Sequence, residues 1–226
     1  MAEYEALGVN VVHAWGMTES SPVVTANAPK PASARLDAQA RLDERVTQGR
    51  VVFGVEVEAH DDAGRPVPRD GRTQGHLVFR GQWIASAYYR APETQVSADG
   101  WFSSGDVGVI DAEGFVTLTD RTKDLIKSGG EWISSIAIEN IAVGHPQIAE
   151  AAAIAVAHEK WGERPLLIVV PRPGCAPEPE SVRAFFEGKL SKWCIPDTVL
   201  VVESIPHGAT GKILKTELRR LYGNAP

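Results

Sequence analysis

Cysteine is scarce in this chain, and its scarcity excludes two kinds of fold. Cys175 and Cys194 are the only two cysteines among 226 residues. Two cysteines cannot build a disulfide framework or a four-cysteine zinc site, and reduced thiols are typical of cytosolic proteins. The six histidines are scattered without metal-ligand spacing, which argues against other zinc sites. We therefore expect a cytoplasmic protein that needs neither disulfides nor zinc.

Basic charge and long hydrophobic runs are missing as well. Lys and Arg number 23 against 29 Asp and Glu, which gives a net charge of −6. This acidic balance excludes a broadly basic surface, so we expect no nucleic-acid partner. No apolar run approaches the ~18–20 residues of a membrane span, so we expect no transmembrane segment. The acidic start, residues 1–8, does not have the basic region of a signal peptide.

The first half of the chain has the texture of β structure. Alternating valines predict a strand near residues 51–58, and a second strand is expected at 75–80. Residues 101–120 predict a hairpin, because a polar turn that ends in Gly114 separates two apolar runs. We also expect a short helix at residues 85–90. Strands at this spacing indicate a small barrel-like or sandwich subdomain.

The pattern changes after about residue 122. Ser134 can cap a helix that runs to about Val143, and Glu139 is expected to support that cap. Further apolar segments predict three short strands and two helices, at 151–157, 166–170, 199–202, 179–192 and 214–221. We therefore expect an α+β protein with two domains, residues 1–122 and 123–226.

A polar, glycine-bearing segment follows the first valine-rich stretch. Gly16 allows close backbone approach, Thr18 offers a hydroxyl, and Glu19 is a hard oxygen ligand suited to Mg²⁺. Taken alone, the segment is better interpreted as a capped helix start with Trp15 packed in the core.

Two further segments carry charge. Asp106 follows a glycine, and its carboxylate could accept both hydroxyls of a ribose, although a turn-capping role is favoured when it is considered alone. The charged run at residues 120–127, which contains Arg121 and Lys123, is by default a solvated linker.

The last two segments are loops with paired or flanking glycines. Gly129 and Gly130 form a tight turn beside Trp132, whose ring could stack on a planar group, but a turn without ligand is nearly as good an explanation. Lys212 lies on a Gly-flanked loop, where its ammonium could reach a carboxylate or phosphate, although most such lysines are merely exposed.

The order and spacing of all five segments together resemble the adenylate-forming superfamily, and most closely its fatty-acyl-CoA synthetases. The resemblance rests on Trp15-Gly16-Met17-Thr18-Glu19, on residues 100–106 with Asp120-Arg121, on residues 123–134, and on Gly211-Lys212, and it runs from about Val9 to Leu221. It implies an AMP-forming acid–CoA ligase that uses ATP, Mg²⁺ and coenzyme A with a fatty acid. It also implies the end of a large adenylation domain, followed by a small mobile domain.

The resemblance assigns roles to individual residues. Lys212 is the catalytic lysine of adenylate formation, Lys123 lies at the hinge, and Glu19 with Thr18 binds Mg²⁺. The nucleotide-binding positions are Trp15, Gly16, Met17, Thr18, Asp106, Arg121, Lys123, Lys127 and Trp132. After the small domain rotates, Gly129, Gly130 and Glu131 would guide the pantetheine arm of coenzyme A.

The chain departs from the family in one respect. Such ligases have a large N-terminal portion with a glycine-rich phosphate loop and an acyl pocket, and this sequence contains neither. We expect it to be inactive alone, with the missing half or a second copy as partner. A non-catalytic AMP- or CoA-binding or docking module is the alternative, as is part of an aryl-acid ligase or carrier-protein adenylation domain.

Overall fold

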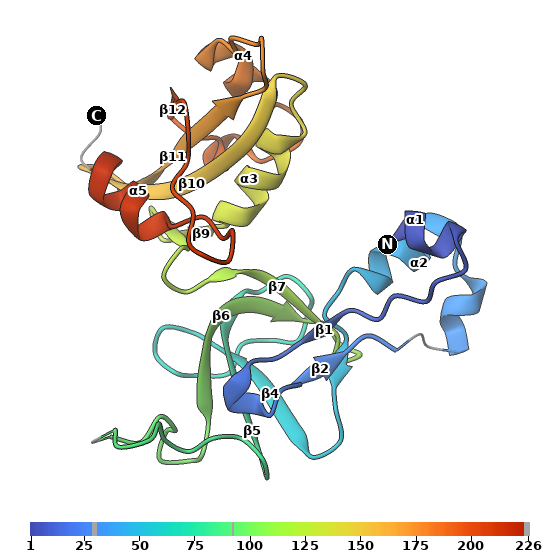
Figure 1. The fold of residues 1–226 in the computed structure, drawn as a ribbon. Helices are drawn as coiled ribbons and strands as arrows, with labels where there is room; N and C mark the ends of the chain where they lie inside the picture. The colour runs from blue at the N-terminus through green and yellow to red at the C-terminus, as the bar shows by residue number, and fades with distance from the viewer. Residues whose placement is uncertain (29–30, 92, 224–226) are drawn as a thin grey trace. The chain divides into compact units, whose positions relative to one another are not determined.

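The computed structural model describes residues 1–28, 31–91 and 93–223 and has an α+β fold, as predicted. It divides into two compact units, Met1–Thr119 and Asp120–Pro226. No helix within the described ranges is long and apolar enough to cross a membrane. Figure 1 labels most of the helices and strands of both units.

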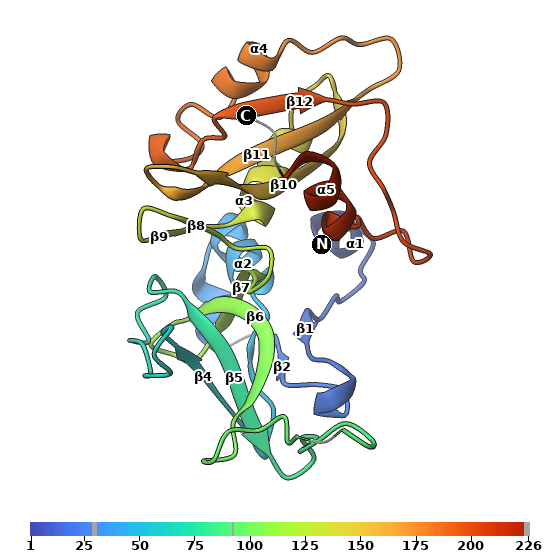
Figure 2. The same ribbon diagram turned by 90° about the vertical axis from the view of Figure 1, so that its left-hand side faces the viewer.

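The first unit contains two antiparallel β-systems and a few short helices. Its elements are α1 (Ala2–Ala6), β1 (Ala14–Trp15), the 3₁₀ turn η1 (Thr18–Ser20), β2 (Thr25–Ala26), η2 (Pro31–Arg35), α2 (Ala38–Arg45), β3 (Arg50–Val51), β4 (Val55–His60), β5 (Gly75–Gly81), β6 (Phe102–Ile110) and β7 (Val116–Arg121). Strands β1, β2 and β3 form one small sheet, and β4 to β7 form the other in sequence order (Figure 2).

The four-stranded sheet is open, with β4 and β7 at its edges in the described part of the chain, so the expected barrel does not close. Val55, Val57 and Ala59 alternate with more exposed residues on β4, as expected for a strand with one buried face. They pack with the fully buried Leu77 and Phe79 of β5. This core fixes the strands on which the candidate site is built.

Two expectations for the first unit can be compared with the structure. The hairpin at 101–120 is confirmed: Gly114 has φ 85°, and β6 and β7 flank its turn. The helix expected at residues 85–90 is wrong, because this segment forms bends and turns in which Arg90 has φ 58°. Tyr88 and Tyr89 are exposed there, so the segment has no apolar face to bury.

The second unit is a five-stranded sheet with helices on both faces. Its elements are β8 (Ile126–Ser128), β9 (Glu131–Ile133), α3 (Ser135–Val143), β10 (Ile148–His158), β11 (Gly162–Pro171), α4 (Pro179–Ala184), η3 (Lys192–Cys194), β12 (Thr198–Val201) and α5 (Lys215–Tyr222). The strand order is β10-β11-β8-β9, and β12 pairs in parallel with β11.

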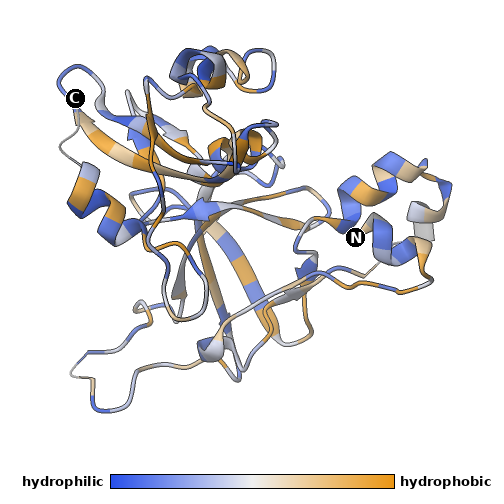
Figure 3. Ribbon diagram, turned by 45° about the horizontal axis from the view of Figure 1, so that its top comes forward, coloured by the Kyte–Doolittle hydropathy of each residue, from blue (hydrophilic) through white to orange (hydrophobic). Residues whose placement is uncertain are grey.

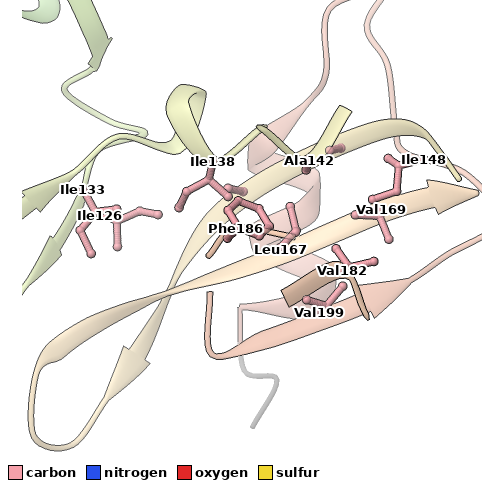
Figure 4. Close-up of a cluster of buried hydrophobic side chains, with 12 residues drawn as sticks. Ile126, Ile133, Ile138, Ala142, Ile148, Leu167, Val169, Val182, Phe186 and Val199 are labelled. Atoms are coloured by element: carbon pink, nitrogen blue, oxygen red, sulfur yellow. The ribbon is translucent and has the colours of Figure 1, made fainter. Parts of the chain in front are cut away.

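Alternation along β10 and β11 creates two separate cores. Ala153 and Leu167 face a cluster completed by Ile138 of α3 and by Phe186, which Figure 4 shows. The residues that alternate with these along β10 and β11, Ile154 among them, face a second cluster on the opposite side of the sheet. Leu218 of α5 is fully buried in this second cluster. Helix α5 has one hydrophobic and one hydrophilic side in Figure 3, so it covers this face of the sheet.

The helix ends of the second unit follow local chemistry. Ser134 is the N-cap of α3, and its hydroxyl accepts the Ala137 amide at 3.1 Å, as predicted. Glu139 does not support this cap, because it lies beyond the third helical position at which a capping-box side chain reaches back. The helix expected at 179–192 is shorter, since α4 ends at Ala184 and Gly188 has φ 74°.

Candidate functional site

Trp15 and Asp106, which are 91 positions apart in sequence, are brought together in the first unit. The indole Nε1–H of Trp15 donates a hydrogen bond of 2.9 Å to Asp106 Oδ2. The indole ring is 8% exposed and packs edge-on against Phe79, with ring centroids 5.9 Å apart. The expected core packing of Trp15 is therefore present, and the same side chain also orients the carboxylate of Asp106.

A bulge in β6 presents Asp106. Ser103 pairs with Val78 and Val107 with His76, so residues 104–106 face Leu77 alone. Gly105 has φ 74°, a left-handed conformation that glycine adopts without strain. The Ser104 hydroxyl donates to the Leu77 carbonyl at 2.7 Å and accepts the Asp106 amide at 3.0 Å. The bulge therefore holds Asp106 out of the regular ladder.

The turn after Trp15 is held by its own backbone. A Cβ on Gly16 would lie 1.9 Å from the Pro22 carbonyl oxygen, so glycine is required by the chain itself rather than by a ligand. The Ser20 hydroxyl accepts the Met17 amide at 2.9 Å and donates to the Met17 carbonyl at 2.8 Å. An α-helix does not begin here, since only the 3₁₀ turn η1 forms. Thr18 is exposed on this turn.

Glu19 is hydrogen-bonded to a tyrosine that the sequence did not single out. The Tyr88 hydroxyl donates to Glu19 Oε1 at 2.6 Å, and the Ala85 amide donates to the Glu19 carbonyl at 2.9 Å. The hydrogen bond to Glu19 raises the pKa of the Tyr88 phenol above its ordinary value, because it stabilises the protonated form. The two contacts attach the segment after β5 to η1.

The oxygen donors on η1 could hold magnesium only together with other ligands, such as waters and substrate phosphates. Within the described ranges, no group of three or more His, Cys, Asp or Glu side chains could hold a metal ion. Magnesium usually keeps several waters and binds one or two carboxylates together with substrate phosphates. The Glu19 carboxylate and the Thr18 hydroxyl are donors of that kind.

The second unit brings Arg121, Lys123 and Lys212 together around one pocket. The pocket has a volume of about 420 Å³ and is lined by the end of β7, the following turn, the Lys212 loop and α5. All three side chains are exposed. The lining also contains Lys215, Arg219 and three carboxylates, those of Asp120, Asp124 and Glu139. Cations therefore outnumber carboxylates five to three, a balance that favours anions such as phosphates or carboxylates.

Backbone hydrogen bonds shape the loop that carries Lys212. The Gly208 amide donates to the Lys212 carbonyl at 2.8 Å, and the Leu214 amide donates to the Pro206 carbonyl at 2.9 Å. Gly211, directly before the lysine, has φ 76°. His207 Nε2 lies 3.4 Å from Glu150 Oε2 on β10. The loop is therefore a defined hairpin, with Lys212 on its returning side.

A polar network that sequence reasoning missed joins this loop to the start of the unit. Lys215 Nζ lies 2.6 Å from Glu139 Oε1 and donates to the Ser135 hydroxyl at 2.7 Å. The Ser135 amide donates to the buried carboxylate of Asp120 at 2.5 Å. Burial raises the pKa of Glu139, and Lys215 opposes the shift. The only sequence signal for Lys215 is its position three residues after Lys212.

The paired glycines form the two-residue turn between β8 and β9. Gly129 and Gly130 have φ 58° and 89°, which is typical of a two-residue hairpin turn with both central residues left-handed. A Cβ on Gly129 would lie 2.9 Å from the Trp193 ring, whereas one on Gly130 would meet nothing within 4 Å. Glu131 follows on β9 and is exposed.

Lys127 and Trp132 are directly opposite each other on β8 and β9. The Lys127 ammonium lies 5.3 Å from the centroid of the Trp132 ring, within cation–π range. The Lys127 amide donates to Glu163 Oε2 at 2.7 Å. This pair covers one side of the hairpin that ends in the glycine turn.

Arg164, near the glycine turn, has a structural role. It is 6% exposed, and its guanidinium donates to both Asp197 oxygens at 2.6 and 3.0 Å. It also donates to Ser128 Oγ at 3.2 Å and to the carbonyls of Trp193 and Ile195 at 2.8 and 3.1 Å. All five of its bonds are to protein atoms, so it holds the base of the hairpin against the following loop.

The candidate residues thus form two sets, one in each unit. Trp15, Gly16, Met17, Thr18, Glu19 and Asp106 belong to the first unit, and Arg121, Lys123, Lys127, Gly129, Gly130, Glu131, Trp132 and Lys212 belong to the second. Within each unit, residues distant in sequence become neighbours, as Trp15 with Asp106 and Arg121 with Lys212 show.

Two family models match the chain. The AMP-binding enzyme model matches residues 1–89, and the AMP-binding enzyme C-terminal domain model matches residues 137–212. The 3-methylmercaptopropionyl-CoA ligase of Ruegeria pomeroyi is 48% identical over 98% of this chain and 41% of its own length. The medium-chain-fatty-acid–CoA ligase of Ectopseudomonas oleovorans is 48% identical over 96% of this chain and 40% of its own length.

A solved structure with the same fold is ATP-bound MatB from Rhodopseudomonas palustris. It is 30% identical, with a TM-score of 0.79 over 96% of this chain and 41% of that one. The chain therefore spans about two fifths of the length of the curated relatives it matches. The resemblance inferred from the five motifs is confirmed, and the chain belongs to the AMP-binding enzyme family of adenylate-forming proteins.

Proposed function

We propose that this chain is the C-terminal, nucleotide-handling part of an acyl-CoA ligase that acts on fatty acids. In the reaction, ATP and a carboxylic acid form an acyl-adenylate and pyrophosphate, and the thiol of coenzyme A then displaces AMP. The observation that carries the proposal is the pocket that Lys212 lines together with Arg121 and Lys123. Adenylation must bring two anions together, and cationic side chains stabilise that approach.

Asp106 is the residue we assign to the ribose of the nucleotide. A carboxylate accepts several hydrogen bonds, so it can bind the two ribose hydroxyls while it accepts the indole N–H of Trp15. The bulge and the Trp15 bond fix its orientation before any ligand arrives, which reduces the entropy that binding must overcome. Gly16 and Met17 would line the adenine side of the same unit.

Lys212 is the residue we assign to the chemical step. Its ammonium would hold the attacking carboxylate against the α-phosphate and offset the charge that develops there. Arg121 would contact the ribose. Lys127 and Trp132 would close over the nucleotide in the adenylating arrangement of the two domains, residues 1–122 and 123–226.

Magnesium and coenzyme A complete the assignment. Glu19 and Thr18 would hold Mg²⁺, which supplies Lewis-acid polarisation of phosphate oxygens when it is bound. Gly129, Gly130 and Glu131 would guide the pantetheine arm, and the open space at Gly130 suits the close approach of a chain-like ligand. Lys123 would be the hinge between the two half-reactions.

Whether the 226-residue chain turns over by itself is a separate matter, and we propose that it does not. The glycine-rich phosphate loop and the acyl pocket of the family are not found in these residues. A non-catalytic module that binds AMP or coenzyme A, or that docks on the missing half or a second copy, is the other candidate. A third candidate is part of an aryl-acid ligase or carrier-protein adenylation domain, because the acid pocket of the family lies outside these residues.

Calorimetric titration of the purified chain with AMP tests the nucleotide assignment. We expect Asp106→Asn to weaken AMP binding about tenfold or more, because charge-assisted hydrogen bonds to the ribose are lost while an amide oxygen can still accept from Trp15. Lys192→Ala, which removes an exposed lysine that does not line the pocket, is the control. Equal AMP affinity of the Asp106→Asn variant and the parent chain would contradict the ribose assignment.

Pyrophosphate release with ATP, Mg²⁺ and a panel of fatty acids tests the activity. We expect none from the chain alone, and clear turnover would disprove that part of the proposal. In a chimera that supplies the preceding part of the Ectopseudomonas oleovorans ligase, Lys212→Ala should depress adenylate formation far more than thioester formation from supplied acyl-AMP. Equal losses in both steps would remove the role assigned to Lys212.

A further inference from the structure

A four-residue link follows the division between the two units. The chain divides between Thr119 and Asp120, β7 ends at Arg121, and β8 begins at Ile126. Within the link, the amides of Asp124 and Leu125 both donate to the Arg121 carbonyl at 2.9 Å. A short link of this kind limits which backbone dihedral angles can change if one part turns against the other.

Arg219 of α5 binds this link from a position 95 residues later in the chain. Its Nη2 donates to the carbonyl oxygen of Lys123 at 2.9 Å and to Asp124 Oδ1 at 2.5 Å. Asp124 is only 8% exposed. One guanidinium therefore holds two neighbouring residues of the link, through one backbone and one side-chain oxygen.

The element that carries Arg219 is itself firmly attached to the second unit. Leu218, the residue directly before it, is fully buried in the cluster between α5 and the sheet. Hydrogen bonds between charged groups are shorter and stronger than neutral ones. The side chains of Arg219 and Asp124 are 29% and 10% exposed, so this pair is partly shielded from water. The link is therefore attached, through the Arg219 side chain, to a helix that is packed against the sheet of the second unit.

The position of the held carbonyl decides where rotation can occur. Both dihedral angles of Lys123 lie upstream of its carbonyl group, so they can change while that carbonyl stays bound. The dihedral angles of Asp124 and Leu125 lie downstream, between the bound carbonyl and strand β8. They cannot change without breaking the Arg219 contacts.

We propose that Arg219 is a positioning residue that fixes the downstream end of the pivot at the Lys123 carbonyl. Every residue from that carbonyl onward then moves with the second unit, and rotation is confined to Lys123 and the residues before it. The inference deepens the proposed function, since it rests on Lys123 being the hinge. It accounts for a pivot at Lys123 rather than at Asp124 or Leu125.

Hydrogen exchange followed by mass spectrometry tests the proposal on the 226-residue chain without nucleotide. In Arg219→Gln, we expect amide exchange in residues 122–126 to become about tenfold faster, because two charge-assisted contacts are lost. Exchange in β10 and β11 should stay unchanged. Arg220→Gln, on the same helix, loses only an exposed pair with Glu217 and should behave like the parent chain.

A second variant separates positioning from simple stabilisation. Arg219→Gln leaves the Asp124 carboxylate buried without its cation, so Arg219→Gln/Asp124→Asn removes that charge as well. We expect the faster exchange in the link to persist in the double variant while its melting temperature returns toward that of the parent.

Exchange in residues 122–126 within twofold of the parent in both variants would overturn the proposal. An equal rise throughout β10 and β11 would do the same, because it would show a general loss of stability. No substrate enters this experiment, so its failure is distinguishable from a failure of the proposed ligase function.

Discussion

Trp15 shows how one side chain can serve the core and the site at once. Its ring packs against Phe79, and its N–H orients Asp106. Tryptophan suits this position because it has a large apolar body with one polar atom that needs a partner when buried. The packing expected from the sequence is present at this residue, and the nucleotide role that we propose would use the same side chain.

The hydrogen bond between Tyr88 and Glu19 leads to a prediction about a single side chain. Glu19→Gln should lower the pKa of the Tyr88 phenol toward its ordinary value, because the negative charge that disfavours phenolate is gone. An ultraviolet titration of phenolate absorbance measures this change. Subtracting the curve of Tyr88→Phe identifies the contribution of Tyr88 among the four tyrosines. If that contribution titrates at the same pH in both backgrounds, Glu19 does not control the phenol.

At the scale of the element, the β8–β9 hairpin depends on two glycines for different reasons. Both adopt positive φ, but only Gly129 lies against aromatic rings, those of Trp193 and Trp161. The Gly129 amide also donates to the Trp161 carbonyl at 2.8 Å. Gly130 faces open space, so only its backbone conformation requires glycine.

Alanine substitutions at the two positions should therefore differ. Both variants are destabilised because alanine is strained in the left-handed conformation. Gly129→Ala must also displace the Trp193 ring, which should add about 1–3 kcal/mol to its loss of unfolding free energy. Urea denaturation of the two variants measures the difference, with Gly130→Ala as the matched control. Equal losses would mean that the Trp193 ring moves aside at no cost.

Local chemistry made several elements predictable from sequence. The Asp111 to Gly114 turn predicted the β6–β7 hairpin, and Ser134 predicted the start of α3, because each needs only neighbours in the chain. The helix expected at 85–90 failed because helix-compatible residues there have no face to bury. Helix α4 ends at Ala184, and the positive φ of Gly188, which apolar periodicity does not reveal, is incompatible with an α-helix that continues to residue 192.

Candidate residues of the site could be named from the sequence only where they belong to one of the five motifs. Glu19, Asp106 and Lys212 could be singled out as residue types suited to magnesium, ribose and phosphate chemistry, respectively. Tyr88, which binds Glu19, could not be singled out, and neither could Lys215 and Arg219, which bind Ser135 and Asp124. Each of these contacts joins segments 69 to 95 residues apart. Gly16 was noticed for a ligand, but the Pro22 carbonyl is what requires it.

At the scale of the whole molecule, each unit has its own hydrophobic core. One cluster lies in the first unit, and two lie on the opposite faces of the sheet in the second. Arg164 belongs only to the second unit and joins Ser128, the residues after η3 and Asp197. A change at Arg164 should therefore affect one unit and spare the other.

Arg164→Ala should lower the unfolding free energy of the second unit by about 3 kcal/mol, because it removes five hydrogen bonds and leaves part-buried carbonyl groups without this donor. The transition of the first unit should not move. Urea denaturation followed by hydrogen exchange in each unit measures this. The exposed Arg172 supplies the control variant Arg172→Ala. A parallel shift of both units would contradict separate cores.

The pair of Arg164 and Asp197 predicts how the stability of the second unit changes with pH. Arg164 lowers the pKa of Asp197 below its ordinary value of 3.8 through their hydrogen bonds. A lowered pKa in the folded state means that the stabilisation is present above pH 3.8 and is lost as pH falls through the lower folded value. Acid titration of the parent chain should show this loss in the second unit, and Arg164→Ala should abolish it.

The widened stretch of β6 has a consequence for how related chains can change in length. Residues 104–106 stand opposite a single partner, so deleting two of them would leave a continuous antiparallel ladder between β5 and β6. If Asp106 is one of the two, the shortened protein would form a regular sheet without the acidic side chain that Trp15 orients. A two-residue gap at this point in a relative's sequence, with no aspartate left there, would therefore mark a protein that keeps the architecture without the residue we assign to the ribose.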